Sequence, residues 1–311
     1  MKRRRPMAQA IVQHEAMPWG DISLMAMIAV LVVSLAASAP HTIISENTTI
    51  TFFIRDMKFD DARREAEHGN AKAQFQLAEM YYGGRDVVGE QDVKKDEAEA
   101  FKWMRKAADQ GYAAAEFSIG DRYLKGEAVK KNSAEGLRWL HRSADHGFTP
   151  ADFVIAHAYE YGIDVKQDYA EAFNWYRKAA DQGDRDAQYI LGEMYYHGEL
   201  DEDGQQVVKP DRVAALEWYR KAADQGYAPA QDELGRICYG RKNYRQAYNW
   251  FRTAARQNYM DAAYMLAWLY RYGLGVNKDD AAAFTWESKA AGQGDKYAQY
   301  ELGMMYLQGR G

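Results

Sequence analysis

Residues 60–311 repeat one arrangement of apolar and small positions, in which a first segment has a helical period. In the copy that begins at Ala187, Leu191 follows four positions later, Gly192 five positions later and Tyr195 eight positions later. At about 100° per residue these offsets lie on one face of a helix. We therefore expect a first helix with an apolar core face. A glycine eleven positions after the alanine is expected to end it, because glycine takes the left-handed cap conformation at little cost.

A second helix in each copy is predicted from an aspartate or asparagine that stands seven positions before a tryptophan. Such side chains cap a helix N-terminus by accepting a hydrogen bond from its free backbone amides. The pairs are Asp96 and Trp103, Asn132 and Trp139, Asp168 and Trp175, Asp211 and Trp218, Asn243 and Trp250, and Asp279 and Trp286. A tryptophan at one fixed position beside small alanines is expected to be core between neighbouring helices; a role as a stacking platform for a ligand is the alternative.

The whole arrangement returns about every 36 residues, as from Trp103 to Trp139, and the six letters of Lys106-Ala-Ala-Asp-Gln-Gly111 return at residues 178–183 and 221–226. A repeat of this length, made of two helices, predicts a solenoid of stacked helix pairs. Residues 61–69 resemble the back half of a unit and are expected to cap the array, and residues 295–311 form a final front half. The full units are expected to end near Gly111, Gly147, Gly183, Gly226, Asn258 and Gly294.

The pattern Ala-x3-Leu-Gly-x2-Tyr-x2-Gly, the Asp-led second helix, its tryptophan and Lys-Ala-Ala-x-Gln-Gly together resemble the Sel-one-like repeat family, which is related to the tetratricopeptide repeats. The resemblance covers residues 61–311. It implies an all-α fold, a right-handed superhelix of about six antiparallel helix pairs, and a non-enzymatic adaptor role. The fifth unit departs from the pattern at Cys238, at Asn258 and in the short connection 240–242, which affects the expected local curvature.

The N-terminal region predicts export. Lys2-Arg-Arg-Arg5 precedes the uncharged apolar run 22–39, which ends in Ala37-Ser-Ala39. These features are typical of a secretory signal, although the run is also long enough to remain as a membrane anchor, and a buried helix is a third possibility. We expect residues 1–39 to be signal or anchor, 40–59 a linker and 60–311 the solenoid. Basic residues stay in the cytoplasm, so an anchored chain would carry its repeats on the other side, periplasmic or exported.

Composition excludes several classes of function. The formal net charge of −5 offers no basic field for nucleic acid, which is not an expected partner. A single cysteine excludes intramolecular disulfides and cysteine-based zinc sites. Nucleophile, zinc-protease and phosphate-loop motifs are absent, so no catalytic residue, metal or cofactor is expected. The segment Asp201-Glu-Asp-Gly204 lacks the ligand spacing of a calcium loop and is interpreted as a solvated turn.

A protein or peptide partner is expected on the first helices, at offsets two, six and nine from the first alanine. These positions lie opposite the core face and match the groove of tetratricopeptide relatives. We call them the candidate row: Phe75, Glu79, Tyr82; Phe117, Asp121, Leu124; Phe153, His157, Glu160; Tyr189, Glu193, Tyr196; Asp232, Arg236, Tyr239; Tyr264, Trp268, Arg271. Aromatic anchors among charges are typical of a peptide-binding surface. The alternative is that the aromatics pack against the neighbouring repeat.

Two further hypotheses concern function. The carboxylates Glu79, Asp121 and Glu193 could serve an enzyme of cell-wall or glycan metabolism, if two of them shared a pocket and their pKa values differed. A purely structural tether is the third possibility. The connections 85–92 and 199–207 are longer than the others, and extra loop on one face of a repeat array often contacts a partner.

Overall fold

The computed structural model describes residues 58–84, 93–201 and 203–308, within a compact unit that spans Asp56–Gly311. The predicted signal or anchor 22–39, nearly all of the linker 40–59 and the long connection 85–92 lie outside the described residues. In the part that is described, every helix is too short or too polar to cross a bilayer.

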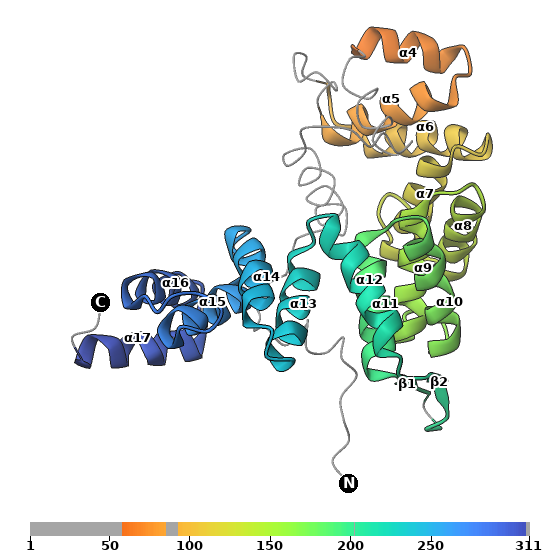
Figure 1. The fold of residues 1–311 in the computed structure, drawn as a ribbon. Helices are drawn as coiled ribbons and strands as arrows, with labels where there is room; N and C mark the ends of the chain where they lie inside the picture. Colours follow the sequence, from red (N-terminus) through yellow and green to blue (C-terminus); the bar gives the residue numbers. More distant parts are fainter. Residues whose placement is uncertain (1–57, 85–92, 202, 309–311) are drawn as a thin grey trace. The chain divides into compact units, whose positions relative to one another are not determined.

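The described residues form an all-α solenoid of helix pairs, as predicted (Figure 1). Each first helix packs against the second helix of its own repeat, and each second helix packs against the next first helix. The helices are α4 (Phe59–Glu67), α5 (Ala71–Gly83), α6 (Glu97–Asp109), α7 (Ala113–Lys125), α8 (Ser133–Asp145), α9 (Thr149–Tyr161), α10 (Tyr169–Asp181), α11 (Arg185–His197), α12 (Arg212–Asp224), α13 (Ala228–Gly240), α14 (Tyr244–Arg256), α15 (Met260–Tyr272), α16 (Asp280–Gly292) and α17 (Lys296–Gln308).

All six predicted N-caps of the second helices are confirmed. Each Asp or Asn side chain accepts a hydrogen bond from a backbone N–H two or three residues later. Asn258, in place of the closing glycine, also takes a positive φ, of 64°. In the fifth unit Arg241 occupies the position of the glycine that ends the first helix in other units. The residue with a positive φ is the next one, Lys242, at 59°. The unusual fifth unit therefore keeps both turns without glycine.

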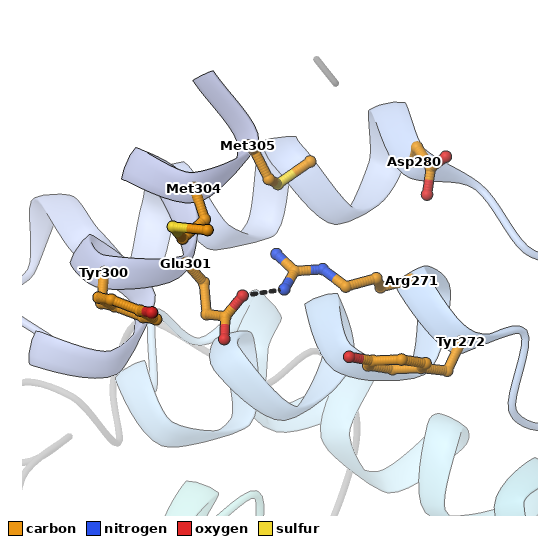
Figure 2. Close-up of a pocket in the computed structure, with 7 residues that line it drawn as sticks. All are labelled: Arg271, Tyr272, Asp280, Tyr300, Glu301, Met304 and Met305. Carbon is orange, nitrogen blue, oxygen red and sulfur yellow. Dashed lines mark hydrogen bonds and ion pairs between the residues drawn. The ribbon is translucent and has the colours of Figure 1, made fainter. Parts of the chain in front are cut away.

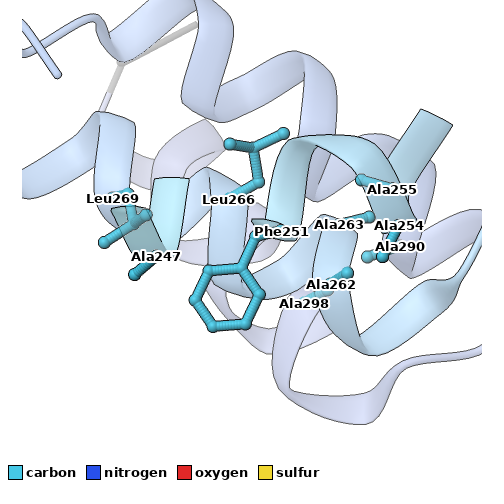
Figure 3. Close-up of a cluster of buried hydrophobic side chains, with 10 residues drawn as sticks. All are labelled: Ala247, Phe251, Ala254, Ala255, Ala262, Ala263, Leu266, Leu269, Ala290 and Ala298. Carbon is cyan, nitrogen blue, oxygen red and sulfur yellow. The ribbon is translucent and has the colours of Figure 1, made fainter. Parts of the chain in front are cut away.

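The six tryptophans pack in or against the hydrophobic clusters, as expected, but five of them are only partly buried there. Trp139 is buried, with 3% of its surface exposed, whereas the other five are half-buried. The fully buried position is the next one along the chain, for example Phe251 after Trp250 (Figure 3). Lysines three positions on cover several of the indoles, with Lys106 Nζ 3.7 Å from the ring centre of Trp103. The tryptophans therefore lie at the edge of the core.

A ladder of polar pairs also joins the two helices of each of the first five repeats, and the member on the first helix is buried in every pair. The residue after the first alanine pairs with the residue before the closing glycine. Gln110 Nε2 donates to Gln74 Oε1 at 2.7 Å, and Gln225 Nε2 donates to Gln188 Oε1 at 2.8 Å. The same positions hold His146 beside Glu116, Gln182 beside Asp152 and Gln257 beside Gln231. Because unpaired buried amides are costly, these pairs fix how the helices align.

The long connection of the fourth unit contains a short antiparallel hairpin, β1 (Glu199–Leu200) and β2 (Gln206–Val208). Val208 is buried in the hydrophobic cluster of α9, α10 and α11. Asp201 Oδ1 accepts backbone hydrogen bonds from Asp203 at 3.0 Å and Gln205 at 2.7 Å, so this carboxylate stabilises the turn. Over the described ranges, no three His, Cys, Asp or Glu residues are grouped as metal ligands.

Candidate interaction surface

The aromatic residues at offset two of the candidate row contribute to packing between repeats. The rings of Phe75 and Tyr112 lie 5.4 Å apart, and those of Phe117 and Phe148 lie 5.3 Å apart. In both cases the second ring opens the first helix of the next repeat. Tyr189 contacts Tyr227 in the same way. Phe153 packs on Tyr176 of its own repeat, and Tyr264 packs on Tyr297 of the next. This is the arrangement that the alternative interpretation anticipated for these positions.

Several polar members of the candidate row are bound by the second helix of their own repeat. The phenol of Tyr176 donates to Glu160 Oε2 at 2.6 Å, and that of Tyr219 donates to Glu193 Oε1. The row was expected to lie opposite the core face, yet at these two positions the second helix of the same repeat contacts it. Burial raises the pKa of both carboxyl groups, although each tyrosine hydrogen bond opposes the rise.

At the two ends of the described array, charged row residues also have partners, in the same helix or in neighbouring ones. Arg271 forms ion pairs with Glu287, at 2.7 Å, and with Glu301. Asp121 forms an ion pair at 2.7 Å with Lys125, one turn further along its own helix α7. Burial raises the pKa of Glu79, and the nearby Arg122 guanidinium opposes that rise.

Other members of the candidate row contact residues of the first or second helices beside them. The guanidinium carbon of Arg122 lies 4.3 Å from the ring centre of Tyr82. Leu124 lies against the backbone of Gly136 on the second helix of its repeat. Trp268 Nε1 donates to the Tyr239 hydroxyl at 3.2 Å. These contacts leave less of the row free than the sequence implied.

Two row residues, His157 and Arg236, are exposed. The His157 ring lies 4.4 Å from that of Tyr161. Arg236 Nε donates to Asp232 Oδ2 at 2.6 Å, and one of its terminal nitrogens lies 3.5 Å from Asp261. Arg236 therefore lies at the surface above a buried carboxylate, since Asp232 is 2% exposed. Burial raises the pKa of Asp232 to about 7, against the opposing charge of Arg236.

A cavity of about 300 Å³ lies between the fourth and fifth repeats, where α11 ends, α12 begins and α13 ends. Two of its residues belong to the candidate row, Tyr196 and Arg236. The other lining residues were not predicted from the sequence: Arg212, Leu216, Glu233, Ile237, Gly240 and Arg241. Arg212 and Arg241 lie at helix ends, and the candidate row contains only offsets two, six and nine of the first helices. The available signal was that no other repeat has an arginine at either position.

A second cavity, of about 240 Å³, lies between α15 and α17 (Figure 2). Arg271 reaches toward Glu301 across it, and Tyr272, Tyr300, Met304 and Met305 surround them. In the six preceding repeats a second helix packs on the equivalent side of the first helix. α17 is the last element that the structure describes.

The arrangement gives the enzyme hypothesis no shared site. Glu79, Asp121 and Glu193 lie on three different first helices, and each interacts with a different cation or phenol. None of the three lines either cavity. Acid and base chemistry needs two groups near one reacting atom, which these residues do not provide.

Comparisons with known proteins agree with the helix-pair architecture. The family model of the Sel1 repeat matches seven segments: residues 71–112, 113–148, 150–184, 185–227, 228–259, 261–295 and 296–311. These bounds place one first helix in every segment. No curated protein sequence gives a match.

Two solved structures are similar in both sequence and fold. One is a protective antigen of uropathogenic Escherichia coli strains that displays an SLR fold, with 34% identity, 82% of this chain covered and a TM-score of 0.73. The chain spans 52% of that antigen. The other is a Sel1 repeat protein from Oxalobacter formigenes, with 33% identity, 78% of this chain and 93% of that chain covered, and a TM-score of 0.61. On the repeats and these relatives, the chain belongs to the Sel1-repeat family.

Proposed function

We propose that this protein is a scaffold that binds a partner protein on the exposed part of its first helices. Sel1-repeat proteins are generally helical scaffolds for protein interaction rather than enzymes, which supports the general kind of function. The partner, the binding face and the location are part of the proposal.

The observation that carries the proposal is the contrast between constant and variable positions within one repeated scaffold. The first alanine is buried in every repeat, from Ala73 to Ala298. By contrast, offset six is acidic in three repeats and differs in the other three: Glu79, Asp121, His157, Glu193, Arg236, Trp268. Of these, His157 and Arg236 are exposed. A position that only maintains the repeated fold holds a similar residue in each unit. Variation on a rigid, preorganised row is what recognition of one particular partner requires, because rigidity lowers the ordering cost of binding.

Steric blocking tests the binding face. In a Cys238→Ser background, His157→Cys introduces a single thiol on an exposed row position, and Arg138→Cys places one on an exposed second-helix position whose native side chain is 75% exposed. Each purified variant is coupled to a maleimide polymer and used to capture proteins from the cells that produce it. We expect the polymer at 157 to prevent capture and the polymer at 138 to leave it intact. Equal capture by both coupled variants would contradict the proposed face.

The proposed location is outside the cytoplasm, with residues 22–39 as signal or anchor. The basic segment 2–5 followed by an uncharged run supports it. Cell fractionation with protease treatment of intact spheroplasts tests it: external protease is expected to digest the repeats. A chain that stays protected in intact spheroplasts and is soluble after lysis would refute this location.

A further inference from the structure

Three arginines meet at the cavity between the fourth and fifth repeats, and each occupies a position at which no other repeat has an arginine. Arg212 follows the N-cap of α12, where other repeats have Glu97, Ser133, Tyr169, Tyr244 or Asp280. Arg241 replaces the glycine that follows the first helix in other repeats. Arg236 stands at offset six, where acidic, aromatic or histidine residues are found elsewhere. The scaffold does not need these arginines, since the other repeats fold without them.

The charges of two of these arginines are not used within the described chain. Arg236 is neutralised by Asp232 and Asp261, at 2.6 Å and 3.5 Å. Neither Arg212 nor Arg241 forms an ion pair in residues 58–84, 93–201 and 203–308, and both are exposed. The Arg212 guanidinium lies 5.5 Å from the ring centre of Tyr196, which orients it beside the cavity. Two guanidinium groups therefore remain available to an anion.

The rest of the lining is apolar, apart from one carboxylate. Tyr196, Leu216 and Ile237 are half-buried and supply apolar surface next to the arginines. Glu233 lies 4.0 Å from Arg236 Nε and interacts with it. The cavity volume of about 300 Å³ is at the lower end of ligand sites, so it fits side chains of a segment better than a cofactor.

We propose that this cavity is the specificity pocket of the interaction surface and receives an acidic residue, with an adjacent apolar residue, from an extended segment of the partner. Arg212 and Arg241 bind the carboxylate through paired N–H donors, because the planar guanidinium matches the two carboxylate oxygens. Tyr196, Leu216 and Ile237 pack against the apolar neighbour. The inference rests on the proposed scaffold function and adds the chemistry of the partner.

A displayed library of random dodecapeptides, selected on the full purified chain, tests this chemistry directly. We expect the selected peptides to contain Asp or Glu beside an aliphatic or aromatic residue. Their affinity is expected to fall at least tenfold in the double variant Arg212→Gln/Arg241→Gln and to decrease with added salt. The variant Arg212→Lys/Arg241→Lys should recover part of the binding, because it restores charge without the planar donor pair.

A matched control removes the same charge elsewhere. Arg177→Gln/Arg256→Gln replaces two exposed arginines of α10 and α14 and is expected to keep full affinity. Circular dichroism confirms that each variant is folded. Peptides without acidic residues, or equal binding to the Arg212→Gln/Arg241→Gln variant, would overturn the inference. If binding of these peptides were still prevented by the polymer at position 157, the scaffold proposal would hold although the acidic-peptide inference had failed. A library without any binding peptide would count against both the scaffold proposal and the acidic-peptide inference.

A phosphate ligand is a separate outcome of the same experiment. Displacement by inorganic phosphate of peptides that show no preference for Asp or Glu would assign the arginines to phosphate recognition and overturn the acidic-peptide inference. Displacement only by the free peptides, with phosphate inactive, is the result that we expect.

Discussion

The side-chain amide of Gln225 donates to the carbonyl oxygen of Gln188 at 2.8 Å, across the two helices of the fourth repeat. Gln188 Nε2 also donates to the Ala180 carbonyl at 3.1 Å in the preceding second helix. Gln188 is 5% exposed, so water cannot replace a lost partner. This one side chain links three successive helices, and the equivalent position is polar and buried in the first five repeats.

The first prediction concerns this ladder. Gln225→Ala is expected to destabilise the protein by about 1–3 kcal/mol, because it leaves the buried Gln188 oxygen without its donor. The double substitution Gln188→Leu/Gln225→Leu should cost less than the two single leucine substitutions together, since the buried Gln188 amide is then removed along with its partner. Urea unfolding followed by circular dichroism measures both. Additive losses would show that the two amides do not interact.

The second prediction separates the tryptophan from the residue that follows it. Phe251 has no exposed surface and is surrounded by alanines and Leu266 (Figure 3), whereas Trp250 is half-buried. Phe251→Ala is expected to cost about 3–5 kcal/mol, as for other large core residues, and Trp250→Ala about 1–2 kcal/mol. A larger decrease in the urea midpoint for Trp250→Ala than for Phe251→Ala would show that the tryptophan contributes more to the core.

The third prediction compares two glycines at the same repeat position. A Cβ added at Gly235 would lie 2.6 Å from the Phe251 ring, while one added at Gly303 would have no neighbour within 4 Å. Alanine favours a helix by about 1 kcal/mol over glycine. Gly303→Ala is therefore expected to raise helicity and stability, and Gly235→Ala to lower stability by about 1–3 kcal/mol through overpacking.

Thermal unfolding tests this prediction, because the melting temperature is expected to rise for Gly303→Ala and to fall for Gly235→Ala. A gain in melting temperature for Gly235→Ala would mean that α13 and α14 are not in close contact at this point.

The fourth prediction concerns pH. Burial, with Glu193 nearby, raises the pKa of Glu233 to about 7. A carboxyl whose pKa is higher in the folded than in the unfolded chain favours the protonated native state. Ionising this buried carboxyl therefore lowers the free energy of unfolding. The loss is absent below the pKa of the unfolded chain, near 4, grows as pH rises, and is complete above the folded pKa of about 7.

Glu233→Gln is accordingly expected to reduce the loss of stability between pH 5 and pH 8. The Glu233 side chain is 31% exposed, and solvent screening limits the expected effect to about 1 kcal/mol. Asp232, whose pKa is also raised to about 7, is expected to leave part of the pH dependence of stability in place. Urea midpoints at the two pH values provide the test, and a slope identical to that of the unsubstituted chain would contradict it.

Local features of the fold could be predicted because their causes are local. The Asp211 carboxylate accepts hydrogen bonds from Val213 and Ala214, two and three residues away, so sequence spacing was sufficient. Trp250 and Phe251 could not be ranked in this way. Adjacent residues on a helix differ by about 100°, and which one faces the core depends on where the next repeat packs.

The candidate surface was predictable only in part for the same reason. Helical spacing gave the positions of Glu193 and Arg236, but the second helix that supplies Tyr219 to Glu193 is set by the fold. Arg212 and Arg241 meet at one cavity although 28 positions separate them in sequence, because α12 begins beside the end of α13. No other repeat has an arginine at either position, but only the structure shows that the two side chains line one cavity.

Site-specific photo-crosslinking inside the producing cells shows whether a partner protein binds the exposed part of the first helices. A photoreactive amino acid is introduced singly at His157 and Arg236 on the first helices and at Arg138 and Arg177 on the exposed side of the second helices. Positions 157 and 236 are expected to crosslink to the same partner protein, and positions 138 and 177 are expected not to. Crosslinks to one partner from 138 and 177, with none from 157 and 236, would contradict this expectation.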